Sequence, residues 1–150
     1  MNLSQTPEVV SFPASHYVFV EKTGPFQQNA GAAWNEAHSY KPALSEHNQI
    51  TGYLSLYKMG PQVYRAGFAL AAAPKDLPKG LTYEKFAGGK YGRFVLTGPY
   101  TDLPQASGAV WSMAKEKLQL RDDFAIENYL NDPRVTPEPE LKTEILVPIA

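Results

Sequence analysis

The sequence has 150 residues, 15 acidic and 14 basic side chains, and a net charge of −1. It lacks the cluster of Lys and Arg that a nucleic-acid binder normally carries, and the absence of cysteine excludes disulfides, zinc-thiolate sites and cysteine nucleophiles. Because it shows neither a signal peptide at its start nor an apolar run of membrane-spanning length, we expect a cytoplasmic protein without a nucleic-acid or membrane partner.

The first half of the sequence has the pattern of a βαββ unit. Strands are predicted over residues 8–12 and 16–22, and a helix follows over residues 29–40. Two more strands are predicted over residues 50–57 and 63–72. The stretch from Pro13 to Ser15 separates the first two strands, which indicates a bulge or a tight turn. Asn29 is the expected N-cap of the helix, and Pro42 should limit its end.

The second half repeats this order. Strands are predicted within 81–100, followed by a helix over 103–118 and by strands over 124–130 and 140–149. The stretch from Ala87 to Gly89 interrupts the first strand pattern at the place that Pro13 takes in the first half. Asp102 is the expected N-cap, and Arg121, Asp122 and Asp123 are interpreted as a solvated turn.

The two halves are copies of one unit. When residues 7–26 are placed on residues 81–100 without a gap, Tyr17 meets Tyr91, the two Thr-Gly-Pro steps coincide, and Phe26 meets Tyr100. We therefore predict an α+β fold made of two βαββ half-domains, about 7–72 and 81–149, in one domain over 1–150. The largely antiparallel sheet should carry both helices on one side and leave a central groove, where small molecules usually bind.

Glu127 is the first candidate for a functional residue. It lies in the strand pattern of residues 124–130 and shares a face with Ala125 and Tyr129, because side chains alternate along a strand. Its counterpart in the first half is Ser55. A carboxylate on a mostly apolar strand is costly to bury without a cation or hydrogen bonds. Either a ligand cation or an Arg or Lys of the chain could be that partner, unless the side chain lies at an exposed edge.

Glu144 is the second candidate, because it interrupts the apolar final strand. Its counterpart in the first half is Gly67. A glycine at that position leaves room either for a ligand or for the close approach of a neighbouring backbone.

Aromatic side chains are the third group of candidates, because their faces attract organic cations. The candidate ligand contacts are Tyr57, Tyr129, Trp34, Trp111, Tyr53 and Phe68. Trp34 and Trp111 have the alternative role of anchoring the helices to the sheet. Tyr17 and Tyr91 are interpreted as repeats of one core position.

These motifs together resemble those of the GyrI-like superfamily. The resemblance rests on the duplicated βαββ plan, the repeated Thr-Gly-Pro step, and the segments 86–91 (FAGGKY), 126–130 (IENYL) and 143–149 (TEILVPI). Members of the superfamily include gyrase-inhibitory proteins and the effector-binding domains of multidrug-sensing transcription regulators. The resemblance implies a groove lined by aromatic residues, in which Glu127 and Glu144 would receive cationic amphipathic ligands. Since the repeat starts within ten residues of the first residue, we expect no fused DNA-binding module.

Three functions stay open at this point. The leading one is a stand-alone domain that binds an aromatic, cationic small molecule and needs no cofactor or metal. A hydrolase of reactive electrophiles is the alternative, with Glu127 as general base and Tyr57 or Tyr129 as proton donor. The third is a protein-interaction role such as gyrase inhibition. Whether an edge strand joins two copies into a homodimer is also open.

Overall fold

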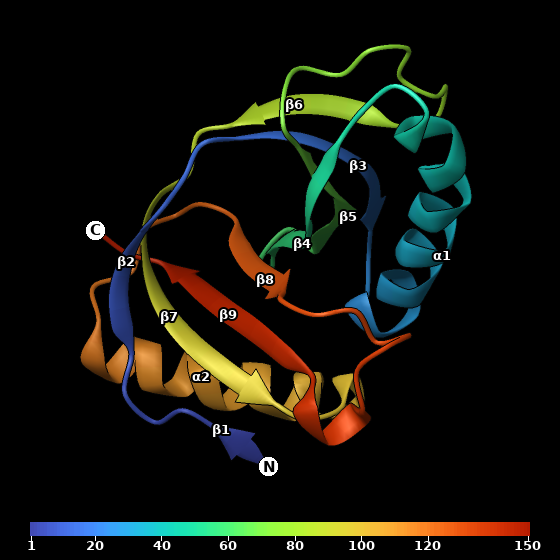
Figure 1. Ribbon diagram of the computed structural model, residues 1–150. Helices are drawn as coiled ribbons and strands as arrows, with labels where there is room; N and C mark the ends of the chain where they lie inside the picture. The colour runs from blue at the N-terminus through green and yellow to red at the C-terminus, as the bar shows by residue number, and fades with distance from the viewer. The chain divides into compact units, whose positions relative to one another are not determined.

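A computed structural model of the protein describes residues 1–150, which form two compact units of mixed α and β structure (Figure 1). One unit consists of Met1–Phe12 with Gly89–Ala150, and the other of Pro13–Gly88. Inside each unit the neighbouring strands pair antiparallel and one long helix accompanies them. The predicted α+β class, with a largely antiparallel sheet and two helices, is therefore confirmed.

The Pro13–Gly88 unit contains, in chain order, β3 (Ser15–Thr23), α1 (Phe26–Ser45), β4 (Ile50–Lys58), β5 (Val63–Leu70) and β6 (Thr82–Phe86). Its strands lie in the order β4-β5-β3-β6. The helix α1 packs across β3 and β5 (Figure 1) and buries Ala33 and Ala37 against them. Small residues on that face let the helix lie close to the sheet, so the aromatic side chains on either side of them meet the strands.

The other unit contains, in chain order, β1 (Asn2–Leu3), β2 (Glu8–Phe12), β7 (Gly89–Thr97), the 3₁₀ helix η1 (Tyr100–Asp102), α2 (Leu103–Lys117), β8 (Ala125–Tyr129), the 3₁₀ helix η2 (Glu138–Glu140) and β9 (Lys142–Pro148). The strands β7, β9 and β8 lie side by side, and β1 and β2 pair along the outer edge of β7. The helix α2 covers one face of β7 and β9 (Figure 1). The core between them contains Phe94, Leu96, Ile145, Val147, Ala106, Val110 and Ala114.

The two breaks in the strand patterns mark the borders of the compact units. We expected a bulge or a tight turn at each, but β2 does not continue its pairing into the next strand of its own repeat. Instead β2 pairs with β7, and β6 pairs with β3 in the matching register. Each compact unit therefore contains the first strand of the other repeat. The chain passes between units at Phe12–Pro13 and at Gly88–Gly89, where both glycines adopt positive φ.

The ends of the first helix differ from the prediction. It begins at Phe26 instead of residue 29, so Asn29 lies in its first turns, where its side-chain amide donates to the Thr23 carbonyl at 2.9 Å. Pro42 lies inside α1 and does not end it, because the apolar face continues to the buried Leu44 and tertiary packing holds the last turn.

The second helix agrees with the prediction to within one residue. Asp102 stands at its N-cap position, but the carboxylate makes no capping hydrogen bond, since its backbone is already helical and lacks the extended conformation of a capping residue. Neither helix combines the length and the apolar character of a membrane span.

The repeated tyrosines occupy equivalent core positions, as predicted. Tyr17 and Tyr91 are fully buried, and each donates its phenol to a main-chain carbonyl. The acceptor of Tyr17 is Leu54 at 2.8 Å, and that of Tyr91 is Phe124 at 3.0 Å. A buried phenol needs such a partner, and both copies supply a main-chain carbonyl, although the two acceptors are not equivalent positions of the repeat.

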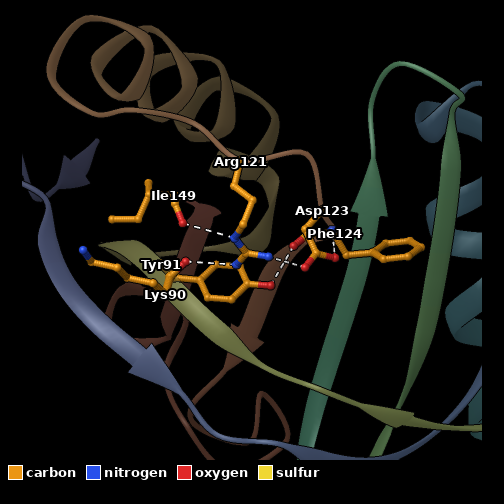
Figure 2. Close-up of polar contacts among 6 residues, drawn as sticks. All are labelled: Lys90, Tyr91, Arg121, Asp123, Phe124 and Ile149. Carbon is orange, nitrogen blue, oxygen red and sulfur yellow. Dashed lines mark hydrogen bonds and ion pairs between the residues drawn. The ribbon is translucent and has the colours of Figure 1, made fainter.

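The segment after α2 is an anchored structure and not the solvated turn that we expected. Figure 2 shows the Arg121 guanidinium reaching the carbonyl oxygens of Ile149 and Lys90, both at 3.1 Å, and pairing with Asp123. The same guanidinium lies 5.3 Å from the ring centre of Tyr91. Burial, together with the carboxylate of Asp123, raises the pKa of Tyr91 to about 12. Arg121 thus joins the ends of β7 and β9 to the segment that leads into β8.

Candidate functional site

Glu127 lies in the middle of β8, where the alternation of side chains places it on the same face as Tyr129. The Tyr129 phenol donates a hydrogen bond of 2.8 Å to its carboxylate. Glu127 is partly buried, and this burial raises the pKa of its carboxyl, although the hydrogen bond from Tyr129 acts in the opposite direction. No Lys, Arg or His forms an ion pair with it. The charged form of Glu127 therefore lacks an internal cation.

An aromatic pair adjoins this carboxylate. The ring of Tyr100, in η1 at the start of α2, meets the ring of Tyr129 edge-on with the centres 5.5 Å apart. The first repeat has the same contact, since Phe26 at the start of α1 meets Tyr57 edge-on at 5.7 Å. Tyr100 was not among the site residues predicted from the sequence. Its position after the repeated Thr-Gly-Pro step, where it matches Phe26, was the signal that could have identified it.

Glu144 lies on the opposite face of its sheet from Glu127. On that face it forms an ion pair with Arg93 of β7 and accepts a hydrogen bond of 2.7 Å from the side-chain amide of Asn128. Asn128 directly precedes Tyr129 in β8, so its side chain points away from the Glu127 face. The structure therefore does not bring the two candidate glutamates together, and the chain itself neutralises Glu144.

Strand register also corrects our alignment of the repeats. Tyr57 and Tyr129 are equivalent positions, and counting from them along each ladder makes Glu144 the counterpart of Arg65 and not of Gly67. A Cβ added to Gly67 would collide with the main chain of β3. The absence of a side chain at Gly67 therefore allows the neighbouring backbone to approach closely, which was one of the two predicted reasons for a glycine there.

Ser55, the counterpart of Glu127, belongs to a polar cluster of three hydrogen-bonded side chains. Its hydroxyl is buried and lies 2.6 Å from the Tyr64 hydroxyl, and the indole N–H of Trp34 donates to both oxygens at 2.9 and 3.0 Å. The three side chains satisfy one another, which ties α1 to β4 and β5. The indole of Trp34 thus has the anchoring role that was one of its two alternatives.

Tyr53 and Phe68 form a second aromatic group in the Pro13–Gly88 unit. Their rings meet edge-on at 5.4 Å, and His38 of α1 lies 6.0 Å from Phe68. The ammonium of Lys41 is 4.9 Å from the ring centre of Tyr53, so a cation of the chain already lies over that ring. Phe68 is fully buried, whereas Tyr53 is partly exposed.

Trp111 of α2 packs against the core that α2 forms with β7 and β9 and is partly buried there. This contact agrees with the alternative role of Trp111, in which it anchors the helix to the sheet. No three His, Asp or Glu side chains lie close enough together to form a set of metal ligands.

Comparison with known proteins gives a consistent family. Residues 5–150 match the model of the GyrI-like small-molecule-binding domain, while no curated protein sequence matches the chain. The fold is similar to the crystal structure of the EcmrR C-terminal domain, with a TM-score of 0.81 and 14% identity over 100% of this chain and 99% of that one.

Two further structures share the fold. SAV2435 bound to tetraphenylphosphonium has a TM-score of 0.74 and 16% identity, covering 96% of this chain and 93% of that one. A hydrolase from Listeria innocua has a TM-score of 0.59 and 13% identity, covering 98% and 93%.

Proposed function

The chain belongs to the GyrI-like small-molecule-binding domain family, and from this premise we propose that it binds aromatic organic cations whose charge is met by Glu127. One observation carries the proposal: the carboxylate of Glu127 is partly buried, accepts a phenol hydrogen bond from Tyr129, and has no cation of the chain beside it. Glu144 differs in that Arg93 already neutralises it, so it has no part in the proposed recognition.

The electrostatics of Glu127 favour a cationic ligand. Burial disfavours its charged form, which is why its pKa is raised. A ligand cation beside the carboxylate would reverse this effect, and part of the binding free energy would come from that reversal. Each aromatic face next to the cation adds about 0.5–2 kcal/mol, and Tyr129 and Tyr100 are the nearest candidates.

The similar proteins support this ligand class. Tetraphenylphosphonium, bound in the SAV2435 structure, combines four aromatic rings with one positive charge. We include Tyr57 and Tyr53 as aromatic contacts in the first repeat, whereas Trp34, Trp111 and Phe68 act as supports of the helices. The groove between the repeats stays a prediction from the sequence.

A thermal-shift screen tests the proposal. Wild type, Glu127→Gln and Glu144→Gln are each heated with cationic, neutral and anionic aromatic compounds, and each shift is measured against the same variant without ligand. Cations should stabilise wild type and Glu144→Gln and should lose this effect in Glu127→Gln. Glu144→Gln is the matched control, because it removes an equal charge from the neighbouring strand.

Other outcomes would contradict the proposal. Equal stabilisation of Glu127→Gln by the cations would remove Glu127 as the counter-charge. No stabilisation by any class would favour the protein-interaction alternative.

A hydrolase is the second candidate, favoured by the hydrogen bond between Glu127 and Tyr129. In this reaction the carboxylate would take a proton from a water molecule, whose oxygen attacks an electrophilic carbon. Tyr129 could give its phenol proton to the leaving group, and the raised pKa of Glu127 would make the carboxylate a stronger base. Turnover of a strained electrophile that is lost in both Glu127→Gln and Tyr129→Phe, with binding retained, would favour the enzyme. Binding without turnover would favour the binding protein.

A further inference from the structure

The hydroxyl of Thr143 in β9 is buried and has no hydrogen-bond partner. Nearly all buried polar side-chain atoms in proteins have at least one partner, because an unpaired one loses its hydration without compensation. A buried hydroxyl without a partner therefore calls for an explanation, such as a group that joins it when a ligand binds.

The position of Thr143 links it to the candidate site. It lies directly opposite Tyr129 on β8, and opposite Leu96 on β7. Residues opposite one another in a ladder share a face, so Thr143 lies on the face that carries Tyr129 and Glu127 and is covered by α2. Thr143 and Glu127 are diagonal neighbours across the two strands, which places them within reach of one small polar group.

The first repeat shows a hydrogen-bonded side chain at the position that corresponds to Thr143. There the residue opposite Tyr57 is Tyr64, whose hydroxyl bonds Ser55 and receives the indole N–H of Trp34. In the second repeat the shorter Thr143 takes the place of Tyr64, and Glu127 takes the place of Ser55. In the first repeat the polar atoms at these positions are hydrogen-bonded, whereas the second has a carboxylate without a cation and a hydroxyl without a partner.

We propose that Thr143 determines ligand specificity by accepting a hydrogen bond from an N–H group of a ligand ammonium whose charge is met by Glu127. The site then prefers protonated amines to quaternary cations of the same shape. This inference rests on the proposed function and deepens it by naming the class of cation.

The chemistry of the three side chains supports this preference. Tyr129 uses its phenol proton on one oxygen of Glu127, so the carboxylate keeps lone pairs for a second donor. A protonated amine brings both a charge and an N–H donor, which can serve Glu127 and Thr143 together. A quaternary cation brings the charge alone and leaves the Thr143 hydroxyl unpaired. One additional hydrogen bond to a charged donor corresponds to roughly tenfold or more in affinity.

Two matched ligands test the proposal by titration calorimetry. Naphthylmethyl-dimethylammonium carries one N–H, and naphthylmethyl-trimethylammonium has a methyl group in its place. Wild type should bind the first about tenfold more tightly. Thr143→Val has the same shape without the hydroxyl. This variant should bind the dimethyl compound more weakly than wild type does, so that it binds the two compounds with equal affinity. Thr143→Ser keeps the hydroxyl and should keep the preference. The folded state of Thr143→Val should be at least as stable as wild type in urea, because the unpaired hydroxyl is gone.

The two proposals fail in different ways. Equal binding of both cations by wild type, lost in Glu127→Gln, would overturn the role of Thr143 and leave the proposed function intact. A preference that persists in Thr143→Val would also overturn this role. Binding of neither cation by wild type would overturn the proposed function and the inference together.

Discussion

The ion pair between Arg93 and Glu144 should contribute to stability, and replacing Arg93 with methionine tests this. The side chain of Glu144 is 14% exposed and that of Arg93 is 28% exposed. Breaking a fully buried pair costs about 3–5 kcal/mol, whereas an exposed pair contributes about 0.2–1 kcal/mol. With intermediate exposure, and with Asn128 still bound to the carboxylate, we expect Arg93→Met to lower the free energy of unfolding by about 2 kcal/mol.

Urea denaturation at pH 7 measures this change directly. For a chain of this length, a loss of about 2 kcal/mol should lower the melting temperature by roughly 4–8 °C. The double variant Arg93→Met with Glu144→Gln should recover part of the loss, because it removes the carboxylate that Arg93→Met leaves without its cation. A loss below about 0.5 kcal/mol, or a double variant that is as unstable as the two single variants summed, would refute the reasoning.

Two further predictions concern the candidate site and its frame. Burial raises the pKa of Glu127 above the ordinary 4.5, so the folded state binds more protons than the unfolded state in that range. The stability of wild type relative to Glu127→Gln should therefore fall as the pH rises from 4.5 through the raised pKa. Urea titrations of both proteins at several pH values measure this difference in stability. A difference that does not change with pH would contradict the prediction. Gly67→Ala should destabilise the fold by about 2 kcal/mol or more, because its Cβ would meet the main chain of Val18. An unchanged urea midpoint would argue against that contact.

The sequence predicted the elements of the fold well, because their signals are local. Apolar alternation located the strands, and the second helix agrees to within one residue. The duplication predicted that Tyr17 and Tyr91 share a core position, and both are fully buried, although their phenols reach main-chain carbonyls at different positions of the repeat. Pro42 was misleading because its local preference to end a helix is weaker than the packing of Leu44 beyond it.

The site was predictable only in part. Glu127 and Tyr129 share a face by strand alternation alone, and the structure shows the hydrogen bond between them. The partner of Glu144 was not predictable, because Arg93 lies 51 residues away and meets it through the pairing of β7 with β9. The unpaired hydroxyl of Thr143 was equally hidden, since burial and the lack of a partner are properties of the packed side chains.

The sequence by itself determined the duplicated βαββ order and the alternation that puts Glu127 beside Tyr129, because both follow from patterns along one stretch of chain. Tertiary structure decided which strands pair, and hence that β2 joins β7 and β6 joins β3. It also decided which of two similar glutamates keeps an uncompensated charge. Strand register sets the neighbours of each side chain, and a shift of two residues preserves the face while replacing every partner. For that reason Glu144 corresponds to Arg65 and not to Gly67, although the sequence alone favoured the glycine.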